Sequence, residues 1–314
     1  LYTHSLLCYT VYIEMGGKFM EFRVLNYFLT VAQEENITKA AEVLHTTQSN
    51  LSRQLAELEN TIGKRLFERG SRKITLTEEG MFLRKRAKEI IALTERTEAE
   101  LKNFNDVVSG VVHIGAVETQ KIQTLADCIL LLKDTYPQIR YNFFSGSIAE
   151  ITDSLNKGLL DFGLLVAPVD MQKYDYIKLP ANDIFGLLMR KDCPLAQLEK
   201  IHPEDIGDYP VFVAHQQLEG NVLSGWLGRD VQSLNMIATF NLITNPALMI
   251  EKGLGMAFTF DNLVRIPEES NLCFRPLEPK VEAELYLVWK KFQMFTKPAE
   301  LFLEGLQNRM NTAL

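Results

Sequence analysis

Residues 20–80 read MEFRVLNYFLTVAQEENITKAAEVLHTTQSNLSRQLAELENTIGKRLFERGSRKITLTEEG, and this stretch decides the fold of the amino-terminal part. Apolar residues recur at helical spacing from Val24 to Ala32, which predicts an amphipathic helix. Asn36 and Thr38 then offer caps for a second, short helix. The alanines of that second helix face inward, and their small size allows another helix to approach closely.

A third helix follows a break in the pattern. Thr47 supplies a hydroxyl at its start, and the helix ends near Gly63. Leu51, Leu55 and Leu58 are predicted to face inward. Two helices joined by a very short turn, the second with a polar leading face, have the spacing of a helix-turn-helix. The exposed residues of that leading face are Gln48, Ser49, Asn50, Ser52, Arg53 and Gln54.

These side chains suit the reading of a DNA groove. Gln and Asn can bond adenine bidentately, Arg can bond guanine, and Ser hydroxyls or helix-terminal amides can bind phosphate. A solvated polar face, which most amphipathic helices have, is the alternative for this helix alone. The next segment favours DNA, because residues 63–76 predict a hairpin turning at Gly70 and Ser71, with five basic residues and one acidic residue between Lys64 and Lys73. A basic hairpin in this place is typical of a wing that contacts the DNA backbone or minor groove.

Residues 20–80 resemble the DNA-binding domain of LysR-type transcriptional regulators. The resemblance is carried, in fixed order, by Tyr27-Phe28, Lys39-Ala40-Ala41, Gln48-Ser49, Leu51-Ser52-Arg53-Gln54, Leu58-Glu59, Leu66-Phe67-Glu68-Arg69 and Leu76-Thr77 with Gly80. It implies a sequence-specific regulator that binds an inverted repeat in double-stranded DNA as a homodimer or homotetramer. It also implies contact with RNA polymerase.

The resemblance further implies which residues contact DNA. Those of the recognition helix are Thr47, Gln48, Ser49, Asn50, Ser52 and Arg53, and those at phosphate or the minor groove are Thr38, Arg69 and Arg72. Asn50 departs from the small apolar residue that the family often has there, so the base preference at this position is left open.

A long helix is predicted from Thr77 to about Asp106, because this stretch has no proline and no glycine after Gly80. We expect its incomplete apolar seam to be buried against a second copy of the chain, and in the resembled family this helix forms the dimer. The seam residues are Phe82, Ile90, Leu93, Leu101 and Phe104. The basic residues near its start are interpreted as a solvated face rather than as DNA contacts: Arg84, Lys85, Arg86 and Lys88.

From Val107 onward, short apolar runs alternate with helical stretches. Strand, helix, strand, helix and strand within residues 111–166 predict a parallel sheet covered by helices, and a second set follows within 186–258. A strand at 284–289 and a final helix at 298–310 are predicted to return to the first lobe. Two lobes with the chain crossing back predict a hinged, periplasmic-binding-protein-like domain. This also fits the effector-binding region of the resembled family.

The predicted fold class is therefore α/β, with an N-terminal winged helix-turn-helix, a long linker helix and a C-terminal two-lobed domain. The predicted boundaries are 20–77, 78–106 and 107–314, with lobe I at about 107–180 and 284–314 and lobe II at about 181–283. Residues 1–19 lack periodicity, and Gly16-Gly17-Lys18 fits a ribosome-binding sequence ahead of Met20, so residues 1–19 are predicted to be translated leader. The intact mass of protein expressed from its native locus tests this, since retention of residue 1 would contradict it.

Ligands of open α/β sheets bind at the carboxyl ends of strands, against helix amino-termini. This rule, with the position of the effector pocket in the resembled family, selects Glu118, Thr119, Ser145, Gly146, Ser147, His215, Thr244 and Asn245. Glu118 has two interpretations. Its carboxylate would repel an acid and favour an amine, a polyol or a cation, or it stabilises the amino-terminus of its own helix. The second is preferred because such an arrangement is common.

Composition bounds the remaining classes of function. The chain is 46% hydrophobic, and its net charge of −7 lies wholly in residues 107–314, because residues 1–106 carry 15 basic and 15 acidic side chains. The four scattered cysteines indicate neither a zinc site nor a disulfide framework. His113 and His215 are interpreted as structural, so no metal and no cofactor are expected. No apolar run reaches the ~20 residues of a membrane span, and no signal peptide is evident, so we expect a cytoplasmic protein.

Three other classes of protein explain less of the chain. An enzyme is the main alternative for α/β lobes, but the sequence contains no G-x-S-x-G elbow, phosphate loop, G-x-G-x-x-G or H-E-x-x-H. A solute-binding protein would account only for residues 107–314 and should carry a secretion signal. An architectural DNA binder would account only for the amino-terminal part. A DNA-binding regulator modulated by a small-molecule effector accounts for both.

Overall fold

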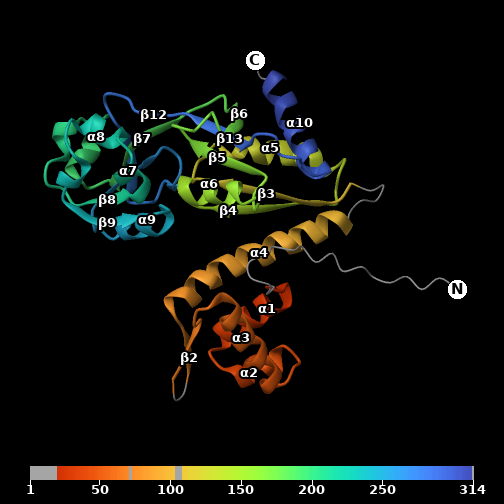
Figure 1. The fold of residues 1–314 in the computed structure, drawn as a ribbon. Coiled ribbons are helices and arrows are strands. Elements are labelled where there is room, and N and C mark those ends of the chain that lie inside the picture. Colours follow the sequence, from red (N-terminus) through yellow and green to blue (C-terminus); the bar gives the residue numbers. More distant parts are fainter. Residues whose placement is uncertain (1–19, 71–72, 103–107, 313–314) are drawn as a thin grey trace. The chain divides into compact units, whose positions relative to one another are not determined.

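The computed structural model describes residues 20–70, 73–102 and 108–312 (Figure 1). The chain forms two compact units, of which the first ends at Ala99 and the second begins at Glu100. The predicted leader, residues 1–19, lies outside the described residues.

The first unit begins with three helices whose ends follow the sequence closely. They are α1 (Phe22–Glu34), α2 (Ile37–Val43) and α3 (Gln48–Ile62). The Asn36 side chain caps α2, because it accepts hydrogen bonds from the backbone N–H groups of Thr38 and Lys39. Gly63 ends α3 with a φ of 73°, a left-handed conformation that glycine adopts without steric cost. The predicted helix-turn-helix is confirmed.

These helices enclose a small apolar core. Phe28, Ala40 and Leu51 are fully buried, and the rings of Phe28 and Phe67 lie 5.2 Å apart. Burial of one such large side chain stabilises the fold by about 1.5–3 kcal/mol. The core therefore fixes the orientation of α3 and leaves the opposite face of that helix free of packing.

The predicted wing is a two-stranded antiparallel hairpin. It consists of β1 (Phe67–Arg69) and β2 (Ile74–Leu76), and residues 71–72 of its turn lie outside the described residues. Glu59, near the end of α3, accepts the backbone N–H groups of Leu66 and Phe67 through Oε1 at 2.7 and 3.2 Å. This carboxylate ties the base of the hairpin to the helix that precedes it.

Helix α4 (Glu78–Lys102) begins where the sequence predicts, and the Thr77 hydroxyl accepts the N–H of Gly80 at 3.0 Å. Glycine is needed at position 80 because a Cβ there would lie 2.1 Å from the carbonyl oxygen of Leu66. Leu83 and Ala87 are buried against the three-helix core, a contact that the sequence analysis does not predict. The predicted seam residues are exposed at Phe82, Ile90, Leu93 and Leu101, whereas Phe104 lies outside the described residues.

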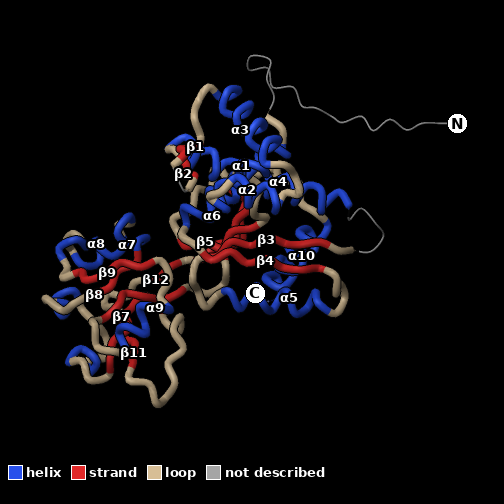
Figure 2. Tube along the Cα trace, turned by 90° about the horizontal axis from the view of Figure 1, so that it is seen from below, coloured by secondary structure: helices blue, strands red, loops and turns tan. Residues whose placement is uncertain are grey.

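The second unit contains two sheets with helices packed on them (Figure 2). The first sheet, in lobe I, has the order β4-β3-β5-β13-β6. Its strands are β3 (Gly110–Ala116), β4 (Ile139–Ser145), β5 (Phe162–Val166), β6 (Tyr174–Lys178) and β13 (Leu285–Lys290). Its helices are α5 (Ile122–Lys133), α6 (Ile148–Asn156) and α10 (Lys297–Thr312). Phe162 is fully buried, with the rings of Phe295 and Phe302 at 5.0 and 5.3 Å.

The second sheet, in lobe II, has the order β11-β7-β10-β8-β9, and β12 pairs with β7. Its strands are β7 (Asp183–Arg190), β8 (Val211–Ala214), β9 (Met236–Phe240), β10 (Met256–Phe260), β11 (Leu272–Pro276) and β12 (Glu282–Ala283). Its α-helices are α7 (His215–Glu219), α8 (Val222–Leu227) and α9 (Thr244–Glu251). Two buried clusters, one around Phe258 and one around Phe212, form its core.

The chain crosses between the lobes twice, after β6 and after β12. β12 pairs with the start of β7 through Glu282 opposite Ile184 and Ala283 opposite Asp183, so the two crossing segments lie side by side. Glu284 alone separates β12 from β13, which pairs with β5 and β6 in lobe I. The predicted return of the chain to its first lobe is confirmed.

The expectation of a parallel sheet is confirmed for the strands predicted within residues 111–166 of lobe I and is wrong for part of lobe II. β3 is parallel to β4 and β5, and β8 is parallel to β9 and β10. β13 runs antiparallel to β5 and β6, and β7 runs antiparallel to β10 and β11. Apolar runs indicate strands but carry no direction, and a strand that enters from the other lobe need not follow a βαβ connection. Strands β6 and β11 and the short helices α7 and α8 are not predicted by the sequence analysis.

Candidate functional site

Helix α3 presents its predicted leading face to solvent. Thr47 caps the helix by accepting the N–H of Asn50 at 3.2 Å, as the sequence predicts. The side chains of this face are exposed or only partly buried: Gln48, Ser49, Asn50, Ser52 and Arg53. Since the three leucines on the opposite face are buried, α3 is anchored on one side and free on the other.

Hydrogen bonds between side chains order the leading face. Gln48 Nε2 donates to Ser52 Oγ at 3.0 Å. Asn50 connects two neighbours, because its Nδ2 donates to Thr46 Oγ1 at 3.0 Å and its Oδ1 accepts from Arg53 Nη2 at 3.2 Å. Each bond joins residues three or four apart, so the helix itself places donors against acceptors. Ordered side chains lose less conformational entropy when they bind a base.

The wing is less free to offer positive charge than its composition suggests. Lys73 Nζ donates to Glu35 Oε2 at 2.6 Å, and this contact raises the pKa of Lys73 and lowers the pKa of Glu35. Lys64 Nζ lies 3.4 Å from Glu79 Oε1. Two of the five basic residues counted in the sequence therefore have acidic partners within the unit. The sequence carries no signal for these pairs, since each joins separate elements.

The other predicted DNA contacts lie at the edges of this unit. Thr38 is exposed in the first turn of α2. Arg69 belongs to β1 and pairs with Ile74 of β2 across the hairpin. Arg72 lies outside the described residues. Thr38 and Arg69 thus fall on the helix before the turn and on the wing, as the sequence predicts, and the contacts of all three residues with DNA stay a prediction.

In the second unit, Glu118 links the two lobes. It follows β3 in lobe I, and its Oε2 accepts the backbone N–H of Ile243, at the start of α9 in lobe II, at 2.7 Å. Burial raises the pKa of Glu118, and the hydrogen bond from Ile243 opposes that rise. The preferred interpretation, in which Glu118 stabilises its own helix, is wrong: it serves the amino-terminus of α9 instead of α5. The correction comes from an approach between residues that lie far apart in the sequence.

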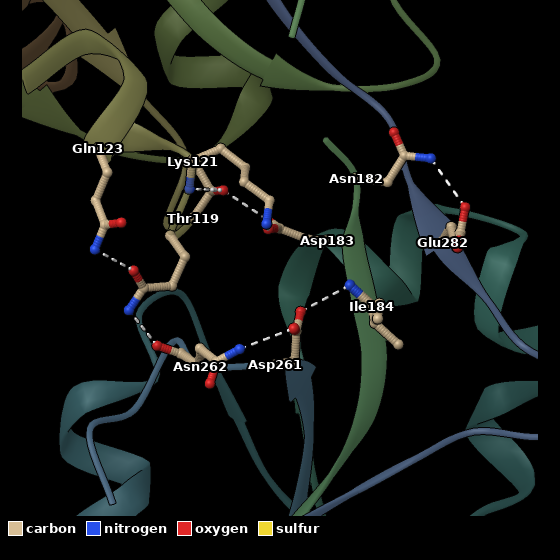
Figure 3. Close-up of polar contacts among 10 residues, drawn as sticks. Thr119, Lys121, Gln123, Asn182, Asp183, Ile184, Asp261, Asn262 and Glu282 are labelled. Carbon is tan, nitrogen blue, oxygen red and sulfur yellow. Dashed lines mark hydrogen bonds and ion pairs between the residues drawn. The ribbon is translucent and has the colours of Figure 1, made fainter. Parts of the chain in front are cut away.

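Thr119 also reaches the other lobe. Its Oγ1 donates to Asp183 Oδ2 at 2.6 Å, and both side chains are buried (Figure 3). The other oxygen, Oδ1, has no hydrogen-bond partner among the described residues, and Lys121 Nζ lies 3.8 Å from it. Burial raises the pKa of Asp183, against the opposing effects of Thr119 and Lys121.

A second polar chain lies beside this contact. Gln123 Nε2 donates to Gln120 Oε1 at 2.8 Å, and Gln120 Nε2 donates to the carbonyl oxygen of Asn262 in lobe II (Figure 3). The groove at this place is lined by Gln120, Lys121, Gln123, Thr124, Asp127 and Asn262. Asp261, next to Asn262, accepts the N–H of Ile184 at 2.8 Å. The start of α5 is therefore bonded to lobe II through several side chains, and we call this region, including Glu118, the lobe junction.

The remaining predicted effector residues divide between capping and exposed positions. Ser147 caps α6 in a reciprocal arrangement with Glu150, whose carboxylate accepts the Ser147 N–H at 2.8 Å. Gly146 is buried and donates its N–H to the carbonyl oxygen of Ala116 at 3.3 Å. Ser145 is exposed at the end of β4. Ser147 therefore has a structural role that the sequence analysis does not predict.

On the lobe II side, Thr244 and Asn245 are exposed in the first turn of α9. His215 is exposed at the start of α7, and its Nε2 lies 3.4 Å from Thr239 Oγ1. Glu118 and the start of α9 are thus brought together, and among the described residues neither His215 nor Ser145 is hydrogen-bonded to them. Within residues 20–70, 73–102 and 108–312, no group of three or more His, Cys, Asp or Glu side chains could hold a metal ion. No helix in these described residues is long and apolar enough to cross a membrane.

Comparison with known proteins gives two family matches. Residues 22–81 match the model of the bacterial regulatory helix-turn-helix proteins of the lysR family, and residues 105–311 match the model of the LysR substrate binding domain. The chain is 27% identical over 299 residues to HcaR, the Hca operon transcriptional activator of Escherichia coli, covering 93% of this chain and 98% of the relative. It is 26% identical over 295 residues to YfeR, a helix-turn-helix-type transcriptional regulator of Shigella flexneri, covering 92% and 94%.

Solved structures show the same fold. Full-length CbnR in complex with its target DNA matches with a TM-score of 0.72 at 18% identity, covering 92% of this chain and 99% of that one. Full-length BenM matches with a TM-score of 0.52 at 21% identity, covering 94% and 98%.

Proposed function

The chain belongs to the LysR family of bacterial regulatory helix-turn-helix proteins, and we propose that it reads DNA with the leading face of α3 and senses an effector at the lobe junction. Membership makes it a DNA-binding transcriptional regulator with an effector-binding domain. The observation that carries the placement on α3 is the ordered, exposed row of side chains from Gln48 to Arg53. A helix packed on one face that holds amide and guanidinium groups in place on the other suits a major groove.

Within this proposal the side chains have separate roles. Gln48, Asn50 and Arg53 read base edges, and the hydroxyls of Thr38, Thr47, Ser49 and Ser52 bind phosphate. Arg69 and Arg72 contact the DNA backbone or minor groove from the wing. The CbnR structure was determined with target DNA, which supports DNA as the partner of this fold.

Arg53→Ala tests the role of the leading face. Loss of a guanidinium that reads a base costs about 1–3 kcal/mol, so we expect operator affinity to fall by about 5- to 150-fold. The measurement is fluorescence anisotropy with DNA from the chain's own upstream intergenic region and with a scrambled duplex, across a salt series. Arg229→Ala, at an exposed position of lobe II, removes the same charge and should bind like the parent. Equal affinity of the Arg53→Ala variant and the parent would contradict the proposal.

We further propose that α4 pairs with the α4 of a second copy and that dimers assemble into tetramers on an inverted repeat. Leu83 and Ala87 are already buried within the unit, whereas Phe82, Ile90, Leu93 and Leu101 stay exposed. Such an apolar stripe on a long helix is suited to a partner helix. Light scattering of the parent and of an Ile90→Glu, Leu93→Glu double variant tests this, since an unchanged mass would contradict it.

We propose that the protein acts in the cytoplasm, contacts RNA polymerase, and regulates without catalysis or a cofactor. The effector is proposed to bind at the lobe junction and to favour one arrangement of the lobes over another, because a ligand shifts such an equilibrium only through differential affinity. Candidate contacts are Glu118, Thr119, Ser145, Gly146, Ser147, His215, Thr244 and Asn245. A shift in operator affinity when a small molecule binds would support this, and binding without such a shift would contradict it.

A further inference from the structure

The amino-terminus of α9, in lobe II, donates a hydrogen bond to a side chain of lobe I. Ile243 stands at the N-cap position with no side-chain cap, and the first turn of α9 contains no acidic residue. The acceptor is Oε2 of Glu118, at 2.7 Å from the Ile243 nitrogen. A helix amino-terminus favours negative charge. The carboxylate of Glu118 therefore occupies the position at this amino-terminus that the carboxylate of a ligand would take.

The second oxygen of Glu118, Oε1, can still accept a hydrogen bond. Among the described residues, Oε1 accepts no hydrogen bond, and no lysine or arginine forms an ion pair with this carboxylate. Glu118 is partly buried, so its charge is incompletely solvated. A group that donates hydrogen bonds and carries positive charge would satisfy Oε1 and offset the loss of solvation.

Charged neighbours at the lobe junction strengthen this preference. Asp183, the first residue of β7 in lobe II, accepts a hydrogen bond from Thr119, the residue that follows Glu118. The ammonium group of Lys121 lies 3.8 Å from Asp183, so it serves that carboxylate and not Glu118. Asp261 is held nearby by the backbone of Ile184 and raises the pKa of Asp183. Among the described residues, Lys121 is the cation paired with Asp183, and Asp261 adds a second carboxylate beside it, so the lobe junction offers little positive charge to a further anion.

We propose that Glu118 determines the class of effector, selecting a molecule with a primary ammonium group and excluding carboxylates from the amino-terminus of α9. This rests on the proposed binding of an effector at the lobe junction. An ammonium group binds Oε1 while Oε2 keeps its bond to Ile243, so the contact between the lobes is strengthened. A carboxylate must displace Glu118 from Ile243 and then lie beside it.

Two ligands that differ only in headgroup test the selection. Full-length protein is titrated by calorimetry with n-butylammonium chloride and with sodium butyrate. We expect the wild type to bind butylammonium at least about tenfold more tightly than butyrate, a difference that one charged contact provides. Absence of butylammonium binding to the wild type, or equal binding of the two, would overturn the proposal.

Two variants separate selection from stability. Glu118→Gln keeps an oxygen for the Ile243 N–H but loses the charge, so it should lose the preference for butylammonium without gaining tight binding of butyrate. Glu118→Ser frees the N–H, so the preference should invert, with butyrate about tenfold tighter than in the wild type. Glu269→Gln, which removes an exposed carboxylate elsewhere in lobe II, should keep the wild-type ratio. A merely structural role of Glu118 would change stability but would not invert the ratio, and an unchanged ratio in Glu118→Ser would overturn the proposal.

Operator binding is measured on the same proteins. If the wild type fails to bind its operator selectively, the proposed function fails whatever the headgroup ratio. If it binds the operator selectively but binds both headgroups equally, only the role of Glu118 fails.

Discussion

The two units place their polar side chains by opposite means. On α3, the bonds that order the leading face join residues three or four apart, as between Gln48 and Ser52. At the lobe junction, Thr119 bonds to Asp183 and Glu118 bonds to Ile243, far along the chain. A site built within one helix depends on the folding of that helix and on the core against which the helix packs. A site built between lobes depends on how the lobes meet, so a ligand can change it.

The largest expected effect breaks the first unit and spares the second. Phe28→Ala removes a fully buried ring from the three-helix core, which costs about 3–5 kcal/mol. We expect this variant to lose operator binding. Both tryptophans, Trp226 and Trp289, lie in the second unit, so their fluorescence during denaturant unfolding should keep the midpoint of the parent.

Phe22→Ala serves as the control for that experiment, because Phe22 begins the same helix but is 58% exposed. It should leave both operator binding and the tryptophan transition unchanged. A Phe28→Ala variant whose tryptophan midpoint falls with its DNA binding would show that the two units unfold together.

An intermediate effect compares two threonine hydroxyls. Thr119→Val removes the donor to the buried Asp183 carboxylate, and we expect a loss of about 1–3 kcal/mol in the tryptophan-detected unfolding of the second unit. Thr47→Val removes the cap of α3, and we expect a loss of about 1 kcal/mol confined to the first unit. Denaturant titrations followed by tryptophan fluorescence and by far-ultraviolet circular dichroism separate the two. A tryptophan transition that moves more in Thr47→Val than in Thr119→Val would contradict the comparison.

The smallest expected effect is a pH dependence. Burial raises the pKa of Asp183 above its ordinary value of 3.8, so the folded state favours the protonated acid. The stabilisation from protonation is fully present below pH 3.8 and is lost as the pH rises through the raised pKa. Relative to Asp183→Asn, the wild type should therefore gain unfolding free energy as the pH falls from about 7 to about 4. Tryptophan-detected unfolding across that range measures it, and parallel profiles of the two proteins would refute it.

The same contrast explains how much the sequence predicts. The helix-turn-helix, its caps at Asn36 and Thr47 and its inward leucines are confirmed, because helical periodicity and capping act within a few residues. The positions of most strands along the second unit are also predicted from apolar runs. The direction of β7 is wrongly expected to be parallel, because a strand pattern does not encode which lobe the chain enters from.

At the candidate sites, the residues of α3 are predicted individually, whereas those of the lobe junction are predicted only by position. Glu118 follows β3 as the sequence predicts, but its hydrogen bond to Ile243 is not foreseen. The pairing of Lys73 with Glu35 likewise has no local signal, because it joins the wing to the end of α1. Contacts of this kind depend on tertiary packing, which periodicity does not describe.

The paired crossing segments of β7 and β12 have a mechanical consequence. Two connections that lie side by side and share backbone hydrogen bonds resist sliding and twisting more than bending. The easiest relative motion of the lobes is then a hinge rotation about a single axis that runs along the paired segments. A domain with a single easy motion has one conformational variable, the opening angle between its lobes, and the hydrogen bonds across the lobe junction fix that angle in this structure.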